Sequence, residues 1–272
     1  MPYRHLLAPL FVLLGLSAAQ AHEVWIEPLE WQVEVGAQVQ AHRINGEEFV
    51  GNKLPWNDRS TVLAEQRSGA QTTPLTGRLG DRPAFTAAQA EAGLMTLIYQ
   101  STYSTITYRE YEKFAGFVTS KGYEQTLAAH AERDLPKSPI KEAYMRFAKS
   151  LVAVGDGAGE DTPRGLELEL VALDNPYTHS GPDLRFQALY RDVPLAGNKV
   201  TVFVRGTDGT VAERSAVTSA EGIVAFAAEP GAAYLVDTVV LREPARALVI
   251  ETKGAVWESL WASLTFRVPD AQ

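Results

Sequence analysis

Apolar and polar positions alternate through the first part of the chain that follows residue 21. The alternation is clearest in five short segments, at 31–35, 38–44, 61–66, 72–79 and 94–101. A period of two is typical of half-buried strands, and Gly36 between the first two segments is a hairpin signal. The pattern predicts a β-rich region from His22 to about Tyr108.

The period changes to a helical one over residues 109–154. Apolar side chains recur at helical spacing before Gly122, and a second short helix is expected at 123–133. A third helix is predicted from Ser138, a candidate N-cap that is followed by Pro139 at the first helical position. Its apolar stripe consists of Ile140, Tyr144, Phe147, Leu151 and Val154.

A polar, glycine-rich stretch at 155–165 is the best domain boundary in the sequence, and flexibility is the expected reason for its composition. Beyond it the chain returns to short strands, which are separated by turns up to residue 268. About seven strands in roughly 100 residues are typical of a sandwich of the immunoglobulin or transthyretin type. The predicted fold is mainly β with a helical insertion. It has two β-sandwich-like domains, at 22–154 and 166–268.

Residues 1–21 have the features of a secretory signal peptide. An apolar run of about 11 residues follows Arg4 and leads to Ala19-Gln20-Ala21, an A-x-A cleavage site. The run is too short to span a bilayer, which needs roughly 20 residues. Cleavage after Ala21 is favoured, and cleavage after Ala19 is the alternative. We therefore expect an exported, periplasmic protein that does not span the membrane after cleavage.

The charge and composition exclude several classes of function. The net charge is −8, and cleavage removes only Arg4 among the charged residues, so the mature chain carries −9. An acidic surface repels phosphate backbones, so nucleic acid is not expected as a partner. The chain has no cysteine, which excludes thiolate chemistry and cysteine-ligated metals. The usual hydrolase, metalloprotease and nucleotide-binding motifs are missing, so no enzymatic activity is predicted.

His22 carries the most informative chemistry in the sequence. Cleavage after Ala21 makes it the mature N-terminus, where its α-amine and imidazole can chelate one metal ion together. Copper and nickel suit such nitrogen ligands. Cleavage after Ala19 would place His22 third, where an amine, two backbone amides and the imidazole form a square-planar chelate. The other interpretation is that His22 merely follows the cleavage site.

Further ligands are less well marked. His42 lies on the polar face of a predicted strand, and His130 lies in a short predicted helix; both are candidate metal ligands. His179 belongs to a loop. Surface placement is the ordinary alternative for all three. Four acidic residues could supply a carboxylate ligand or orient an imidazole: Glu23, Glu27, Glu47 and Glu48.

The opening AHEVWIEP after an export signal resembles the start of the NikM-like periplasmic proteins. Later segments are similar too, among them NGEEF at 45–49, EAYMRFAKSLVAVGD at 142–156, LELVALDNPY at 168–177 and WESLWASLTF at 257–266. The resemblance covers essentially the whole mature chain. It implies an exported, β-rich protein that handles nickel or cobalt, with a metal role for His22.

Three functions remain open at this point. The first is a periplasmic binding protein for a divalent transition metal (nickel, cobalt or copper) that delivers the ion to a membrane transporter. The second is a structural or interaction module of the cell envelope that binds no metal. The third is a copper-dependent oxidase built on His22, which would need a second histidine beside it.

Overall fold

The computed structural model describes residues 22–87 and 91–270. The predicted export signal and both of its alternative cleavage sites lie outside these residues. Over the described part the chain is mainly β, and a small helical insertion interrupts the strands. This confirms the fold class expected from the sequence. No helix in the described ranges is long and apolar enough to cross a membrane.

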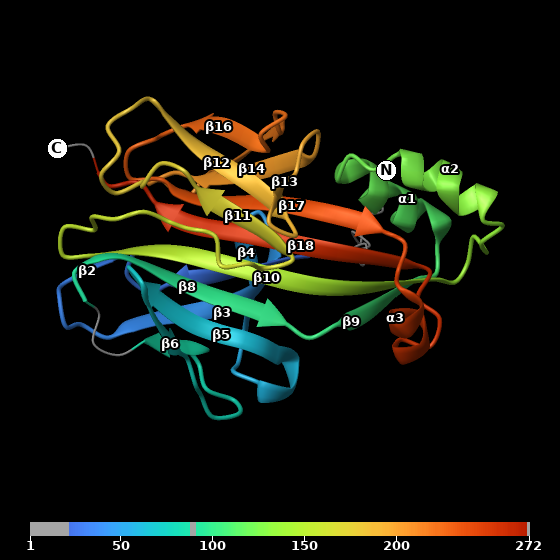
Figure 1. Ribbon diagram of the computed structural model, residues 1–272, viewed down its shortest axis with the longest axis horizontal. Coiled ribbons are helices and arrows are strands. Elements are labelled where there is room, and N and C mark those ends of the chain that lie inside the picture. Colours follow the sequence, from blue (N-terminus) through green and yellow to red (C-terminus); the bar gives the residue numbers. More distant parts are fainter. Residues whose placement is uncertain (1–21, 88–90, 271–272) are drawn as a thin grey trace, which may run out of the picture.

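A sheet of ten strands forms the middle of the molecule (Figure 1). Its main path runs through β15 (Val211–Val217), β14 (Lys199–Arg205), β17 (Ala233–Arg242), β18 (Trp257–Arg267), β10 (Ile140–Val154), β8 (Gly93–Ser101), β5 (Thr61–Ser68) and β6 (Gln71–Pro74). Two short strands, β2 (Gln32–Val33) and β9 (Ser104–Tyr108), also pair with β10. The long strands β10 and β18 are parallel neighbours. Segments from both sides of residues 155–165 therefore share one sheet.

The third predicted helix is wrong, because residues 140–154 form the 15-residue strand β10. Both faces of this strand are buried. Odd positions such as Phe147 and Leu151 pack in one core, whereas even positions such as Ala148 and Val152 pack in another. A strand buried on both faces shows no polar alternation, so its apolar run cannot be distinguished from a helix by period.

Two smaller sheets cover the faces of the central sheet. The first contains β1 (Glu23–Pro28), β3 (Val39–Glu47), β4 (Val50–Leu54) and β7 (Phe85–Ala87). The other contains β11 (Leu168–Ala172), β12 (Asp183–Tyr190), β13 (Val193–Pro194) and β16 (Ile223–Ala227). Each sheet packs its apolar side against the central sheet, so the structure has three layers with a core on either side.

The helices lie at one end of this stack. They are α1 (Tyr111–Ser120), α2 (Gln125–Glu132) and α3 (Arg246–Glu251), together with a 3-10 turn, η1 (Asp58–Ser60). Figure 1 shows α1 and α2 beside the ends of the long strands. Phe114 and Phe117 of α1 pack there with Trp257 and Trp261 of β18. The first two predicted helices are therefore confirmed.

Residues 155–165 are anchored to the central sheet by buried charges. Lys149 Nζ lies 2.8 Å from Asp161 and 3.0 Å from Glu169, and all three side chains are buried. The carboxylate of Glu169 also accepts the backbone N–H groups of Arg164, Gly165 and Leu166. The stretch is thus held by specific contacts and does not behave as a free linker.

Candidate functional site

His22 and Glu47 meet at the edge of the first sheet. β1 begins directly after His22 and pairs antiparallel with β3, so that Glu23 lies opposite Gly46. This register brings Nδ1 of His22 to 2.9 Å from Oε1 of Glu47. The two side chains are 38% and 48% exposed, so a ligand can reach the pair from solvent.

The turn between β3 and β4 forms the floor of a hollow beside this pair. The hollow has a volume of about 520 Å³, and His22, Asn45, Glu47, Glu48 and Asn52 are among its lining residues. Glu48 adopts a positive φ of 50°, which helps to close the turn. The site therefore combines one imidazole with several carboxylate and amide oxygens.

A second hollow of about 140 Å³ adjoins the two glutamates on the other side. Lys121, which directly follows α1, lies in it and binds Glu23 and Asp237, each at 2.9 Å. Burial works against the charge of this lysine, but the two carboxylates raise its pKa. Glu23 is thus held in an internal ion pair, whereas Glu47 and Glu48 line the hollow beside His22.

The structure does not bring His42 to this site. His42 lies opposite Glu27 at the other end of the β1–β3 ladder. His22 is five residues from Glu27, so the two histidine backbones are roughly 16 Å apart. His42 is half-buried, and burial lowers its pKa, as does the nearby Lys53. The polar-face placement expected from the sequence is confirmed, since its neighbours Ala41 and Val39 are buried.

His130 is a structural residue of the helical core. It is 2% exposed, and its ring packs among Tyr111, Phe114 and Trp257. Nδ1 accepts a hydrogen bond from Trp257 Nε1 at 3.0 Å, and Nε2 lies 3.2 Å from the carbonyl oxygen of Pro136. Both ring nitrogens are engaged, so neither is free for a metal. The surface alternative is also wrong, because α2 turns this histidine inward.

No group of three or more histidine or acidic side chains within residues 22–87 and 91–270 has the arrangement of a metal site. His179 lies 3.7 Å from Asp174, but Arg185 holds that carboxylate with two shorter contacts. Among the predicted ligands in this part of the chain, His22 and Glu47 come within hydrogen-bonding distance of each other, and Glu48 lines the same hollow. A protein metal site here would need the α-amine of His22 as an additional donor.

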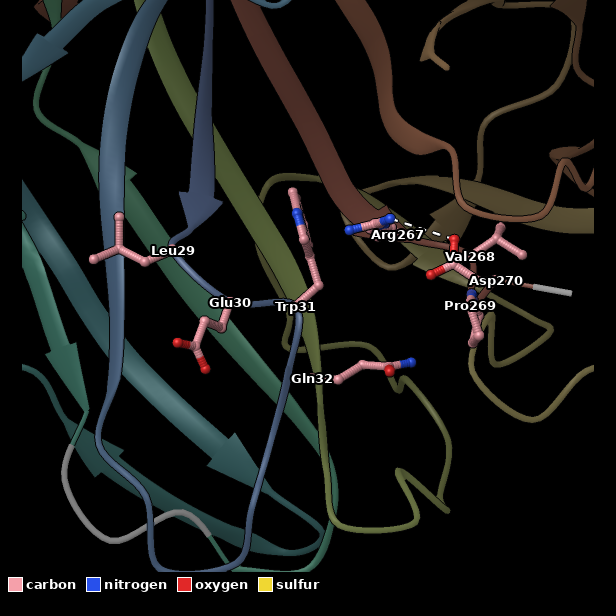
Figure 2. Close-up of a pocket in the computed structure, with 8 residues that line it drawn as sticks. All are labelled: Leu29, Glu30, Trp31, Gln32, Arg267, Val268, Pro269 and Asp270. Carbon is pink, nitrogen blue, oxygen red and sulfur yellow. Dashed lines mark hydrogen bonds and ion pairs between the residues drawn. The ribbon is translucent and has the colours of Figure 1, made fainter. Parts of the chain in front are cut away.

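A smaller hollow near the opposite end of β1 offers different chemistry. Figure 2 shows Arg267 between Trp31 and Asp270 in a pocket of about 360 Å³. Arg267 contacts Asp270 at 3.4 Å. The pocket contains no histidine, and Glu30 is the other carboxylate in its lining. The lining thus offers no imidazole donor.

A comparison with known families matches most of the chain. The profile of a domain of unknown function, DUF4198, matches residues 19–242. The chain belongs to the DUF4198 family. The match covers β1 and the β3–β4 turn, so both His22 and Glu47 lie within the DUF4198 domain.

Two further comparisons, with curated proteins and with solved structures, were made for this DUF4198 domain. No curated protein matches it. A solved structure of the tetra-tandem repeat in the extending region of a large adhesion protein aligns with 10% identity and a TM-score of 0.23. The alignment covers 90% of this chain and 49% of the other, so the chain spans about half of that length. A likeness at this level carries no functional argument.

Proposed function

We propose that this protein is a periplasmic binding protein for a divalent transition metal, namely nickel, cobalt or copper. In this proposal, the α-amine and imidazole of His22 chelate the ion, and Glu47 is the third donor. The protein would then deliver the metal to a membrane transporter. The predicted export signal supports both the periplasmic location and the free amine at His22.

The proposal rests on the orientation of the His22 ring, which places Nδ1 beside Glu47. Only Nδ1 can close a six-membered chelate ring with the amine of the same histidine. Nδ1 is the nitrogen that lies 2.9 Å from the Glu47 carboxylate. A metal bound at Nδ1 would replace the proton shared between these two groups, and the carboxylate would need only a small movement to bind it.

The donor set fits a protein that must release its metal again. Two nitrogens and one oxygen leave coordination positions open to water or to a receiving protein. The site lies at the rim of an open hollow rather than in a core. Neither His42 nor His130 is needed, and the structure holds both elsewhere.

The decisive experiment compares mature protein that begins at His22 with a cytoplasmic version that begins Met-His22. Mass spectrometry first establishes whether export cleaves after Ala21 or after Ala19. The extra methionine turns the His22 amine into an amide, which binds metal poorly. Isothermal titration with nickel, cobalt and copper should therefore show at least about tenfold weaker binding for the extended protein.

His22→Ala should weaken binding further, whereas His42→Ala is the matched control and should not change the affinity. Equal affinity of the His22 and Met-His22 proteins would rule out chelation by the amine. Absence of binding by the mature protein would leave the structural or interaction module as the function to test.

A further inference from the structure

A small cavity lies between the first sheet and strands β8, β9 and β10 of the central sheet. Its volume is about 130 Å³. Because a water molecule takes about 30 Å³ in the liquid, the cavity has room for roughly four waters or one small ion with its hydration. Hydrogen-bonding side chains dominate its lining, among them Arg43, Arg146, Asn45, Ser60, Tyr99 and Ser104. The cavity is distinct from the His22 hollow, although Asn45 borders both.

Arg146 is the most unusual residue of this cavity. It is 4% exposed, and its guanidinium makes no ion pair or hydrogen bond with any part of the chain that the structure describes. The buried Nε and one terminal nitrogen, Nη1, have no partner. The group stacks on Trp261, 4.1 Å from the ring centroid, and lies 4.7 Å from that of Tyr144. These rings hold the planar cation in place without satisfying its N–H donors.

Arg43 approaches the same cavity from β3. It is 6% exposed and donates hydrogen bonds to the Tyr99 hydroxyl at 2.6 Å and to the Pro55 carbonyl at 2.8 Å. Its buried Nε has no partner, and none of its contacts in the described ranges is with a carboxylate. Two buried guanidinium groups thus line one cavity without a counter-ion.

Two other cations inside the described part of the protein are neutralised by carboxylates. Lys121 binds Glu23 and Asp237, and Lys149 binds Asp161 and Glu169. The carboxylates that interact electrostatically with Arg146 already have other hydrogen-bond or ion-pair partners. Glu23 and Asp237 hold Lys121, while Glu142 accepts hydrogen bonds from the hydroxyls of Tyr108 and Ser259. An uncompensated buried charge opposes folding, so its presence beside a cavity points to a ligand that supplies the negative charge.

We propose that this cavity is a binding site for a small oxyanion, in which Arg146 and Arg43 neutralise the charge. The planar guanidinium groups match the oxygens of a phosphate, sulfate or carboxylate group. The Ser104 hydroxyl and the Asn45 amide can donate to the remaining oxygens, whereas the Ser60 hydroxyl already donates to the Asn57 carbonyl. The narrow volume selects an inorganic anion or a short carboxylate. The site is independent of the proposed metal function.

Titrations of metal-free protein with sodium phosphate, sulfate and acetate will test the proposal, with sodium chloride at matched ionic strength as the reference. We expect saturable heat in isothermal titration for at least one oxyanion. Comparison of phosphate and sulfate with acetate will distinguish an inorganic anion from a carboxylate ligand. Sulfate stabilises most folded proteins by exclusion from their surface, so a rise in Tm counts only where an arginine variant lacks it.

Arg146→Met removes the positive charge but keeps a long, unbranched apolar side chain. Arg146→Lys keeps the charge but replaces the planar guanidinium with an ammonium group. We expect both variants to bind the anion at least about tenfold more weakly. Arg146→Met should fold with an unchanged or higher Tm, because the unpaired charge is gone. Arg78→Gln, which removes an exposed arginine, should bind like the unaltered protein. Lack of saturable binding below about 20 mM, or equal binding by Arg146→Met, would overturn the proposal.

Discussion

Trp257 donates its indole N–H to Nδ1 of His130 across a 3.0 Å hydrogen bond that joins β18 to α2. The partners are 127 residues apart in sequence, and both are almost completely buried. The second ring nitrogen of His130 binds the chain just beyond α2 through Pro136. This histidine therefore fastens the helical insertion to the end of the central sheet.

His130→Ala should lower the free energy of unfolding by about 2–4 kcal/mol, since it opens a cavity and leaves the Trp257 N–H buried without a partner. Urea unfolding followed by tryptophan fluorescence measures this loss. His179→Ala, in a partly exposed loop, is the control and should cost far less. Unchanged stability of His130→Ala would contradict the structural role.

Glu47→Gln should weaken nickel or copper binding at His22 by about tenfold, because an amide oxygen is a poorer ligand than a carboxylate. Isothermal titration of correctly processed protein provides the measurement. Glu34→Gln changes the net charge equally at an exposed position after β2 and should leave the affinity unchanged. If both variants lose the same affinity, Glu47 acts through general charge only.

Lys149→Met should destabilise the protein by about 3–5 kcal/mol, because it leaves the buried carboxylates of Asp161 and Glu169 without their shared cation. It should also loosen residues 155–165, which hydrogen exchange can detect as faster exchange of the Arg164 and Gly165 amides. Lys113→Met removes a lysine from a surface pair with Glu110 and is the matched control. Similar unfolding midpoints for the two variants would show that the buried charges do not hold this segment.

Glu142 makes the stability depend on pH. Burial raises its pKa from 4.5 to about 7, although the hydroxyls of Ser259 and Tyr108 oppose the shift. The folded state thus holds the proton more tightly than the unfolded chain. The free energy of unfolding should therefore fall as the pH rises from about 4.5 to about 7, by on the order of 3 kcal/mol from this group.

Glu142→Gln removes the titration while it keeps the size and a hydrogen-bonding end. In urea titrations between pH 4.5 and pH 7, the free energy of unfolding of the variant should depend much less on pH than that of the unaltered protein, because an amide does not titrate. Burial also raises the pKa of Asp237, to about 6, and that contribution is present in both proteins, so their difference isolates Glu142. Parallel stability curves for the two proteins would show that Glu142 does not titrate in this window.

Only part of the candidate site could be predicted from the sequence. The position of His22 after a cleavage motif indicated metal chemistry, and the acidic pair at 47–48 was among the expected carboxylates. Which glutamate faces the imidazole depends on the β1–β3 register, which places Gly46 opposite Glu23. No sequence pattern indicated the cavity that Arg43 and Arg146 line. Arg43 and Arg146 are about 100 residues apart, and what distinguishes them is the absence of a buried acidic partner.

Local patterns alone determined the β-rich composition, the two short helices and the position of most strands. These features arise where one face meets water, because alternation or helical period then shows directly in the residues. Tertiary structure decided the rest. Residues 140–154 became a strand because a sheet covers each of its faces, and His130 became a core residue because Trp257 binds it. Both outcomes depend on partners outside the local segment, and for His130 the partner is 127 residues away along the chain. A short sequence window contains no information about such contacts.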